Sequence, residues 1–362
     1  MLSKLRLALA RTRHASERFG RSPAAIWREL LQLRRLPGRL GVDEYFDYAL
    51  ADNQRWSWHE KQAFRGYASY PLYSRLNAPG SHALANDKVL FHGVMAAAGL
   101  AVPTIDAVYS PGGRRLAGAT TCTDPDQLHV FLANEAAFPL FVKPADGVFG
   151  EGTHWVVSYD AERQMVHCRN ERPASLSAFL APYGWHLRYG LLFQPVVRPH
   201  PGMVAMCGHR VSSVRCLVLL ADEGPRLLCA NWKVPTGDNI VDNTGAWTNG
   251  NMVAAVDADT GEILSLWRGQ DGHARAATLH PDTGIQLTGR YLPDWPALRQ
   301  YVSCAAAQFP DLRLQAWDIV PSDSGVMSFE INLVTESTVF ANQFVHGKGL
   351  LDERLRKALK LP

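Results

Sequence analysis

Hydrophobic positions recur along this chain with two periods, and each period predicts a different kind of element. Near the N-terminus, four apolar residues with helical spacing follow the pair Ser22-Pro23, which predicts a capped helix over 24–36. Asn86 is expected to cap a second helix over 87–98, which stops at Gly99. Further helices are expected after Asp124-Pro125, over 298–309 and over 350–361.

Between these helices the pattern is mostly that of β-strands, rich in β-branched and aromatic residues. Strands are expected over 105–109, 139–144, 153–158, 191–197, 211–220, 226–232 and 252–257. The mixture of helices and strands predicts an α+β chain with a short, mainly helical N-terminal segment. Boundaries near Gly80 and residue 190 divide the chain into 1–80, 81–190 and 191–362.

The most informative pattern lies near the C-terminus. Two segments, 317–320 and 329–332, alternate apolar residues with an acid or an amide, and a turn over 321–325 separates them. If this hairpin folds about Ser324, Asp318 and Glu330 lie opposite each other, and Asn332 shares their face.

Three side-chain oxygen ligands that converge in this way suit a hard cation such as Mg²⁺, which usually keeps phosphates as further ligands. Two alternatives stay open at this point. The acids can simply face solvent, or a register slip of one residue can send them to opposite faces.

Composition narrows the class of protein. The chain has 362 residues, of which 47% are hydrophobic and 20% charged, as in an ordinary globular protein. No apolar run reaches the length of a membrane span, and the basic start lacks the features of a signal peptide. The six cysteines form no C-x-x-C pair, which favours reduced thiols and a cytoplasmic location, with no zinc site or disulfide framework.

Charge is unevenly distributed along the chain. Residues 1–40 carry ten Lys and Arg against two Glu, whereas the net charge of the whole chain is only +3. Such a basic segment on a slightly acidic body suggests an anionic partner or a membrane surface, the alternative being a solvated helix face. Nucleic acid is not expected, because aromatic residues do not interleave with the basic ones.

A possible phosphate site lies upstream of the hairpin. The apolar strand over 139–144 carries Lys143 and leads into a turn with three glycines, Gly147, Gly150 and Gly152. Backbone N–H groups in such a turn can cradle phosphate oxygens, although most glycine-rich turns are only turns. Lys88 is a second candidate cation, whose alternative is an ordinary surface lysine.

The order of these motifs resembles the ATP-grasp superfamily, and within it the sugar-transfer-associated ATP-grasp proteins. The resemblance covers about residues 85–345. The residues that carry it are Asn86-Asp87-Lys88, Phe141 to Pro144, the loop Gly147 to Gly152, Gln194 to Val197, Val214-Arg215, Val241 to Asn243, Asp318 and Glu330 to Asn332.

This resemblance implies an ATP-grasp fold, in which two α+β subdomains grip ATP, and a role for each motif. Lys88, Lys143 and the glycines Gly147, Gly150 and Gly152 would bind the phosphates. Gln194, Pro195, Val196 and Val197 would form the strand that meets the adenine. Asp318, Glu330 and Asn332 would hold one or two Mg²⁺ ions, for which Mn²⁺ can substitute. Arg215 and Lys233 are the catalytic candidates, and Arg215 can alternatively be a structural, salt-bridged arginine.

The expected function is an ATP-dependent carboxylate–amine ligase that forms an amide through an acyl phosphate. The resemblance suggests an amino acid, amino sugar or peptide as a partner, in polysaccharide or secondary-product biosynthesis. The alternatives are a phosphotransferase that acts on a hydroxyl group and a non-catalytic nucleotide-binding scaffold. The expected location is the cytoplasm, peripheral to a membrane if residues 1–40 bind one.

Overall fold

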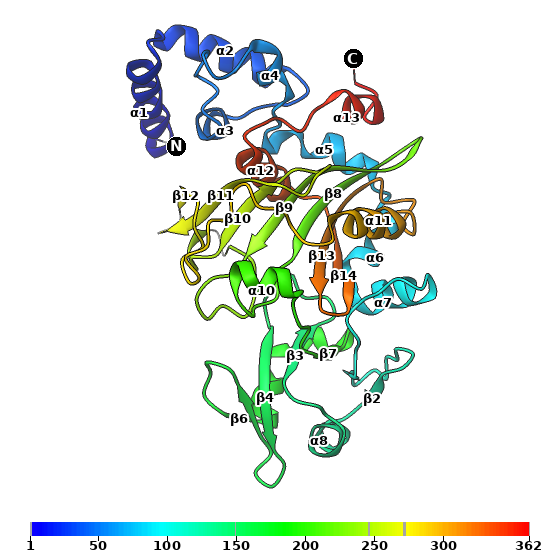
Figure 1. Ribbon diagram of the computed structural model, residues 1–362. Coiled ribbons are helices and arrows are strands. Elements are labelled where there is room, and N and C mark those ends of the chain that lie inside the picture. Colours follow the sequence, from blue (N-terminus) through cyan, green and yellow to red (C-terminus); the bar gives the residue numbers. More distant parts are fainter. Residues whose placement is uncertain (1, 149, 245–246, 271–272, 362) are drawn as a thin grey trace.

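The computed structural model describes the whole chain except residues 1, 149, 245–246, 271–272 and 362. Figure 1 shows three parts of the molecule: the N-terminal helices at one end, a large sheet in the middle and a smaller lobe at the other end. The N-terminal helices are α1 (Leu2–Phe19), α2 (Pro23–Arg35), α3 (Val42–Asp47), α4 (Trp58–Ala63) and α5 (Tyr70–Tyr73).

The smaller lobe is built on a seven-stranded sheet with the order β2-β1-β7-β3-β4-β5-β6. β1 and β2 are parallel, and the other neighbours are antiparallel. Helices α8 (Pro125–Asn134) and α9 (Leu176–Leu180) supply apolar residues to its core. The strands are β1 (Ala107–Tyr109), β2 (Thr120–Cys122), β3 (Leu140–Pro144), β4 (His154–Asp160), β5 (Met165–Cys168), β6 (Ala174–Ser175) and β7 (Leu191–Pro195).

The central sheet is antiparallel throughout, with the order β12-β11-β10-β9-β8-β13-β14. Its strands are β8 (Val214–Ala221), β9 (Gly224–Val234), β10 (Met252–Val256), β11 (Ile263–Gln270), β12 (His273–Ala277), β13 (Leu314–Ser322) and β14 (Gly325–Leu333). Its helices are α6 (His82–Asn86), α7 (Lys88–Ala97), α10 (Pro201–Cys207), α11 (Trp295–Ala306), α12 (Glu336–His346) and α13 (Glu353–Ala358).

Strand periodicity assigns the two faces of the central sheet to different cores. Trp317 and Ile319 point into the core formed with α7, α10 and α11. Leu217 and Ala316 point to the opposite face, where α12, α13 and the segment around Tyr73 cover one end. Asp318, between Trp317 and Ile319, faces this second side, and the other end of that side borders the smaller lobe.

The N-terminal helices have a core of their own, which includes Ile26, Leu30 and Tyr45. Gln343 on α12 connects this unit to the central sheet. Its side chain accepts from the Arg65 N–H at 2.7 Å and donates to the Arg65 carbonyl at 2.8 Å and to the Tyr48 hydroxyl at 2.9 Å. Because Gln343 is fully buried, these bonds are shielded from water.

The predicted elements are largely present, with several corrections. Ser22 and Asp124 cap their helices as expected. The cap of α7 is Asp87 and not Asn86, since the Asp87 carboxylate accepts from the N–H groups of Val89 and Leu90. Strands β2, β5, β6, β11 and β12 and helices α10 and α12 were not anticipated.

The predicted division at residues 80 and 190 also needs correction. β7 belongs to the sheet of the smaller lobe, which therefore extends to Pro195. Helices α6 and α7 pack mainly on the central sheet, because Phe91 and Met95 lie in its core, while Val89 of α7 also contacts the smaller lobe. The chain thus enters the smaller lobe after α7 and leaves it after β7.

Candidate functional site

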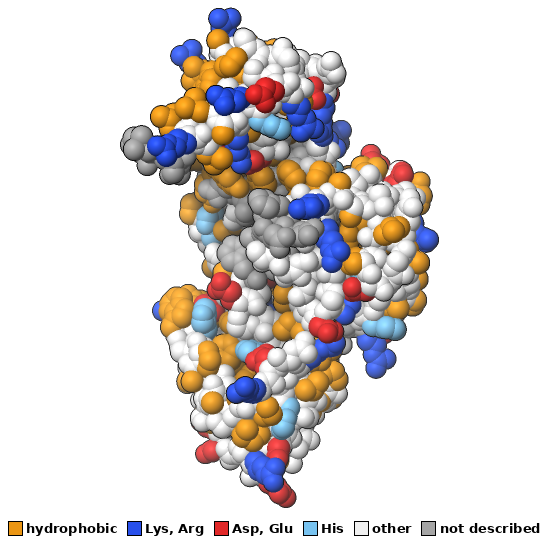
Figure 2. Space-filling view, turned by 90° about the vertical axis from the view of Figure 1, so that its left-hand side faces the viewer, with side chains coloured by type: hydrophobic (Ala, Val, Ile, Leu, Met, Phe, Trp, Pro, Cys, Tyr) orange, Lys and Arg blue, Asp and Glu red, His pale blue; other side chains and the backbone are white. Residues whose placement is uncertain are grey.

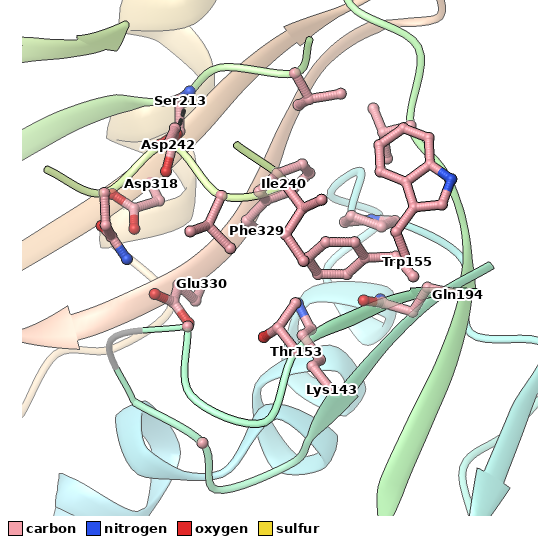
Figure 3. A pocket seen from close by; sticks show the side chains of 18 of the residues that line it. Lys143, Thr153, Trp155, Gln194, Ser213, Ile240, Asp242, Asp318, Phe329 and Glu330 are labelled. Atoms are coloured by element: carbon pink, nitrogen blue, oxygen red, sulfur yellow. Dashed lines mark hydrogen bonds between the residues drawn. The ribbon is translucent and has the colours of Figure 1, made fainter. Parts of the chain in front are cut away.

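A pocket lies between the two sheets, and residues far apart in the sequence form its opposite walls (Figure 3). On the smaller lobe, Trp155, Phe141 and Gln194 form a row across β4, β3 and β7, because Phe141 pairs with both of the others. On the central sheet, Asp318 and Glu330 contribute carboxylates. Figure 2 shows the surface hollowed between these two parts.

The hairpin places Asp318 directly opposite Glu330, as predicted. The route to this register differs from the prediction. The strands close at Ser322 and Gly325, and a β-bulge then shifts the pairing by one residue, so that Phe329 has no partner on β13. Bulges often redirect a side chain, and Phe329 lines the pocket.

Asp318 is the most strongly neutralised acid of the site. Arg215 donates to its two oxygens from Nε at 2.5 Å and Nη2 at 2.9 Å, and Lys233 Nζ donates to Oδ2 at 2.9 Å. Burial alone would raise the pKa of this carboxyl group, but the two cations outweigh burial and hold the pKa well below its usual range. Asp318 is therefore a permanent anion at neutral pH.

Two lysines lie on the other side of Glu330. Lys88 Nζ is 3.5 Å from Glu330 Oε2 and donates to the Gly147 carbonyl at 2.5 Å. Burial and, to a smaller extent, the charge of Lys88 lower the pKa of Lys143, while Glu330 and Asp318 oppose the shift, and the net result is a pKa of about 8. The Lys143 ammonium lies 5.9 Å from the ring centres of Phe141 and Phe329.

The glycine loop approaches both walls closely. Gly150 and Gly152 have positive φ angles of 78° and 65°, which residues with a Cβ rarely adopt. A Cβ on Gly152 would lie 3.2 Å from the Tyr183 ring, and one on Gly150 would lie 3.3 Å from Val241. The loop therefore spans from the smaller lobe to the segment 239–243, which lines the pocket from the central sheet.

Segment 239–243 is held by the side chain of Asn251, which is fully buried immediately before β10. Asn251 Oδ1 accepts from the Thr236 N–H at 2.9 Å and from Asn239 Nδ2 at 2.8 Å. Its Nδ2 donates to the carbonyls of Val241 and Asn243 at 2.9 and 2.8 Å. This one amide thus fixes the wall from several sides.

Asp242 is anchored within the same wall. Its Oδ2 accepts from the Ser213 N–H at 2.8 Å and from the Ser213 hydroxyl at 2.5 Å. Lys233 Nζ lies 3.7 Å from Asp242 Oδ1, so Lys233 lies between two acids. These contacts connect the wall to the cations that surround Asp318.

The two ends of the pocket differ in chemistry. One end is apolar, with Trp155, Ile240 and Phe329 around it, and the other collects the charged groups (Figure 3). At the apolar end, Gln194 is buried and its Nε2 atom has no hydrogen-bond partner. An unsatisfied buried donor is costly, so this amide suits a ligand that brings an acceptor. An aromatic base followed by phosphates fits this arrangement.

The donor set also fits a hard divalent cation. Asp318 and Glu330 offer carboxylate oxygens, and Asn332 adjoins them through a 3.2 Å hydrogen bond from Nδ2 to Glu330 Oε1. A carboxylate has about four lone-pair sites, so Asp318 can accept from Arg215 and Lys233 and still bind a cation. All these ligands are oxygens, which Mg²⁺ and Mn²⁺ prefer.

The pocket brings together most residues that the sequence singled out. Those that line it are Lys88, Lys143, Gly147, Gly150, Gln194, Val196, Val197, Lys233, Asp318 and Glu330. Four others, Gly152, Pro195, Arg215 and Asn332, lie next to lining residues without belonging to the lining. Phe149, within the glycine loop, lies outside the described residues.

Sequence reasoning missed several lining residues, among them Thr153, Trp155, Ser213, Ile240 and Phe329. Thr153 and Trp155 had a usable signal, since alternate positions after a phosphate-binding loop share one face of a strand. Phe329 had none, because only the bulge turns it toward the pocket. Two other polar side chains, His200 and His346, have structural contacts: His200 caps α10, and His346 Nε2 lies 3.0 Å from the Ala230 carbonyl.

The two gripping sheets, the glycine loop between them and the lysines beside the acidic hairpin define an ATP-grasp protein. A family model described as sugar-transfer associated ATP-grasp matches residues 67–359. The chain belongs to this family, as its motifs had suggested.

Solved structures with a similar fold include an L-amino acid ligase from Bacillus licheniformis (11% identity, TM-score 0.38, 77% of this chain and 49% of that one). Another is the VanG D-Ala:D-Ser ligase from Enterococcus faecalis (14% identity, TM-score 0.39, 77% and 63%). A third is a biotin carboxylase from Campylobacter jejuni (11% identity, TM-score 0.42, 79% and 48%). The chain spans about half the length of the first of these proteins. Comparison with curated proteins found no match.

Proposed function

We propose that this chain is an ATP-dependent ligase that joins a carboxylate to an amine. The observation that carries the proposal is the polarity of the pocket. An apolar end with the unpartnered Gln194 donor is followed by Lys88 and Lys143 and then by the acids Asp318 and Glu330. This order matches the order of base, phosphates and metal in a bound metal–nucleotide complex.

In the proposed reaction, an oxygen of the carboxylate substrate attacks the γ-phosphorus of ATP, and ADP leaves. The amine then attacks the carbon of the resulting acyl phosphate, inorganic phosphate leaves, and the amine gives up one proton. When bound to Asp318, Glu330 and Asn332, one or two Mg²⁺ or Mn²⁺ ions would neutralise phosphate charge.

The chain's own residues would hold and polarise the reactants. Lys88 and Lys143 would orient the phosphates, while the segment Gly147 to Gly152 would cover them and exclude water. The strand over Gln194, Pro195, Val196 and Val197 would receive the base. Arg215 and Lys233, already beside Asp318, would stabilise charge on the phosphoryl group in transfer.

An amino acid, amino sugar or peptide is the proposed acceptor class, in polysaccharide or secondary-product biosynthesis. The proposed setting is the cytoplasm, with an anionic partner for residues 1–40. Among the described residues, no helix is both long and apolar enough to cross a membrane.

Hydroxylamine provides a test that needs no knowledge of the natural amine. The protein is incubated with ATP, Mg²⁺, hydroxylamine and a panel of amino acids, sugar acids and peptides. A ligase forms a hydroxamate together with equal amounts of ADP and free phosphate, because hydroxylamine traps an acyl phosphate. Mass spectrometry identifies the acid that was activated.

Other outcomes distinguish the two alternatives. A phosphotransferase would leave the phosphate on an acceptor hydroxyl and form no hydroxamate. A scaffold would bind ATP in calorimetry without turnover under any condition. Either result would refute the ligase proposal, and the Glu330→Gln variant serves as the inactive control.

A further inference from the structure

The N-terminal helices carry charged and apolar side chains that the proposed reaction does not use. Residues 1–40 hold ten Lys and Arg against two Glu. Seven of the arginines are exposed, namely Arg6, Arg13, Arg18, Arg28, Arg34, Arg35 and Arg39. Among the described side chains of this segment, the arginines in ion pairs are Arg11, with Asp43 and Asp47, and Arg21, with Glu29.

Helix α1 presents leucines beside these arginines. Ala8, Thr12 and Ala15 form its buried face, and α1 packs there against α2 and α3. Leu5 and Leu9 are one turn apart and are 56% and 55% exposed. At 3.6 residues per turn, Leu5, Leu9, Arg6 and Arg13 fall within an arc of about 100° that begins beside the buried face, about 20° from Thr12.

This surface stands at one end of the molecule. In Figure 1 the N-terminal helices lie at the end opposite the smaller lobe, which leaves the outer side of α1 clear of the rest of the chain. Figure 2 shows hydrophobic and basic side chains interleaved over this end. Leu7 on α1 and Leu31 on α2 are also exposed, by 50% and 49%.

We infer that α1, with the neighbouring arginines, binds the surface of an anionic lipid membrane. The excess of positive charge over carboxylates in residues 1–40 is complementary to anionic headgroups, and each basic side chain near such a surface adds to the attraction. Leu5 and Leu9 would enter the boundary between headgroups and acyl chains, as in other helices that lie on a membrane. The leucines favour lipid over a soluble polyanion, which offers no apolar phase. This inference does not depend on the proposed reaction.

The test uses the full chain and sedimentation with vesicles of phosphatidylcholine, with and without phosphatidylglycerol. The wild type should bind the vesicles that contain phosphatidylglycerol, and rising salt should weaken this binding. Arg6→Gln with Arg13→Gln should weaken it roughly 30-fold, as expected for two basic residues near the surface. Leu5→Ser with Leu9→Ser should weaken it at unchanged charge.

Matched controls lie on the smaller lobe. Arg163→Gln with Arg172→Gln removes the same charge from exposed positions, and Val130→Ser removes an exposed apolar side chain from α8. Both should bind vesicles like the wild type. Circular dichroism and melting temperature establish that every variant is folded.

Several results would overturn the inference. One is wild-type protein that binds vesicles with and without phosphatidylglycerol equally. Another is a loss of binding in the control variants as large as in the α1 variants. Binding that salt abolishes but the leucine variants leave unchanged would indicate a site for soluble polyanions. Self-association that is lost in the leucine variants, without vesicle binding, would show that a second copy of the chain covers α1.

Discussion

Single residues decide the chemistry of the pocket, and Glu330 is the acid with the most freedom to act. Its side chain is 29% exposed, whereas that of Asp318 is 5% exposed and already bound to two cations. A carboxylate that is open to the pocket is well placed to take a metal ion. The two acids of the hairpin therefore differ in how far the chain's own cations already neutralise them.

Glu330→Gln should lower Mg²⁺-dependent turnover by about 10²- to 10³-fold, as for loss of one preorganised charge-stabilising group. The fold should persist, because Glu330 is only partly buried. Steady-state phosphate release and thermal melting measure the two effects. Asp323→Asn, at the exposed turn of the same hairpin, should keep full activity. A fully active Glu330→Gln variant would contradict the metal assignment.

Lys143 should make ATP affinity depend on pH. With its pKa lowered to about 8, Lys143 is protonated below that pH and neutral above it. Because the phosphates favour the ammonium form, binding above pH 8 must take up a proton, and affinity should fall by up to tenfold per pH unit. Calorimetry between about pH 7 and pH 10 measures this slope.

Lys143→Arg is the control for this prediction, since arginine stays charged over the whole range. Its affinity should be nearly independent of pH. A wild-type affinity that is equally flat would place the phosphates away from Lys143. The stability of the ligand-free protein should change with pH in the opposite direction. Between about pH 8 and 10.5, Lys143 is protonated in the unfolded chain but neutral in the folded protein, so the free energy of unfolding should rise with pH there.

At the scale of elements, the pocket depends on how loops are supported. Segment 239–243 forms neither a helix nor a strand. Hydrogen bonds from the Asn251 side chain hold it in place instead. The glycine loop faces this segment across the pocket, with Gly150 close to Val241. A change at Asn251 should therefore affect nucleotide binding without touching the ligand.

Asn251→Ala should raise the KM for ATP about tenfold or more, since it leaves several buried groups without partners. Asn251→Asp retains the acceptor oxygen but loses the donor, so its KM for ATP should lie between those of the wild type and Asn251→Ala. Activity at saturating ATP should fall less than kcat/KM. Asn134→Ala, which removes an exposed amide bonded to its own helix, should leave KM unchanged. Equal losses in kcat and kcat/KM would argue against a positioning role.

At the scale of the whole molecule, Gln343 unites the N-terminal helices with the central sheet. It is the one described side chain that bonds to Tyr48, to both backbone groups of Arg65 and to the Leu350 N–H at once. Stacked rings of Phe340 and Phe344, 5.8 Å apart, continue the same contact. Stability of the N-terminal unit should therefore depend on α12.

Gln343→Ala should lower the melting temperature by several degrees, because each buried group left unpaired costs about 1–3 kcal/mol. ATP affinity of the folded protein should stay near the wild-type value, since the pocket lies beyond the other end of α12. Differential scanning fluorimetry measures the melting temperature, and calorimetry measures the ATP affinity. Gln308→Ala, at an exposed site on the chain after α11, is the control. An unchanged melting temperature would refute this coupling.

Local patterns in the sequence were sufficient for some features. The helix caps at Ser22 and Asp124, the alternation on β13 and β14 and the pairing of Asp318 with Glu330 depend on neighbours in the chain. The site motifs could be placed along the chain because each of them follows a helix or strand that hydrophobic periodicity predicts. Their assembly into one pocket had to be inferred from the resemblance to a family.

Other features had no local signal. The Phe329 bulge lies on the edge strand β14, while β13 pairs with β8 without a register shift, and a hairpin considered alone does not show this arrangement. The boundary at 190 was wrong because β7 reads like the strands that follow it, although it pairs with β1 and β3. Asn251 looked like an ordinary polar residue before a strand.

The sequence by itself determined which residue types were available and in what order: two lysines, a glycine loop, an acidic hairpin and a basic N-terminal segment. Periodicity and turn chemistry are local, so they carry this information in the linear chain. Only the tertiary structure decided that Arg215 and Lys233 neutralise Asp318, that Gln194 is left without a partner and that Leu5 and Leu9 stay exposed. Distance, burial and exposure arise when separate elements pack, and no single segment contains them.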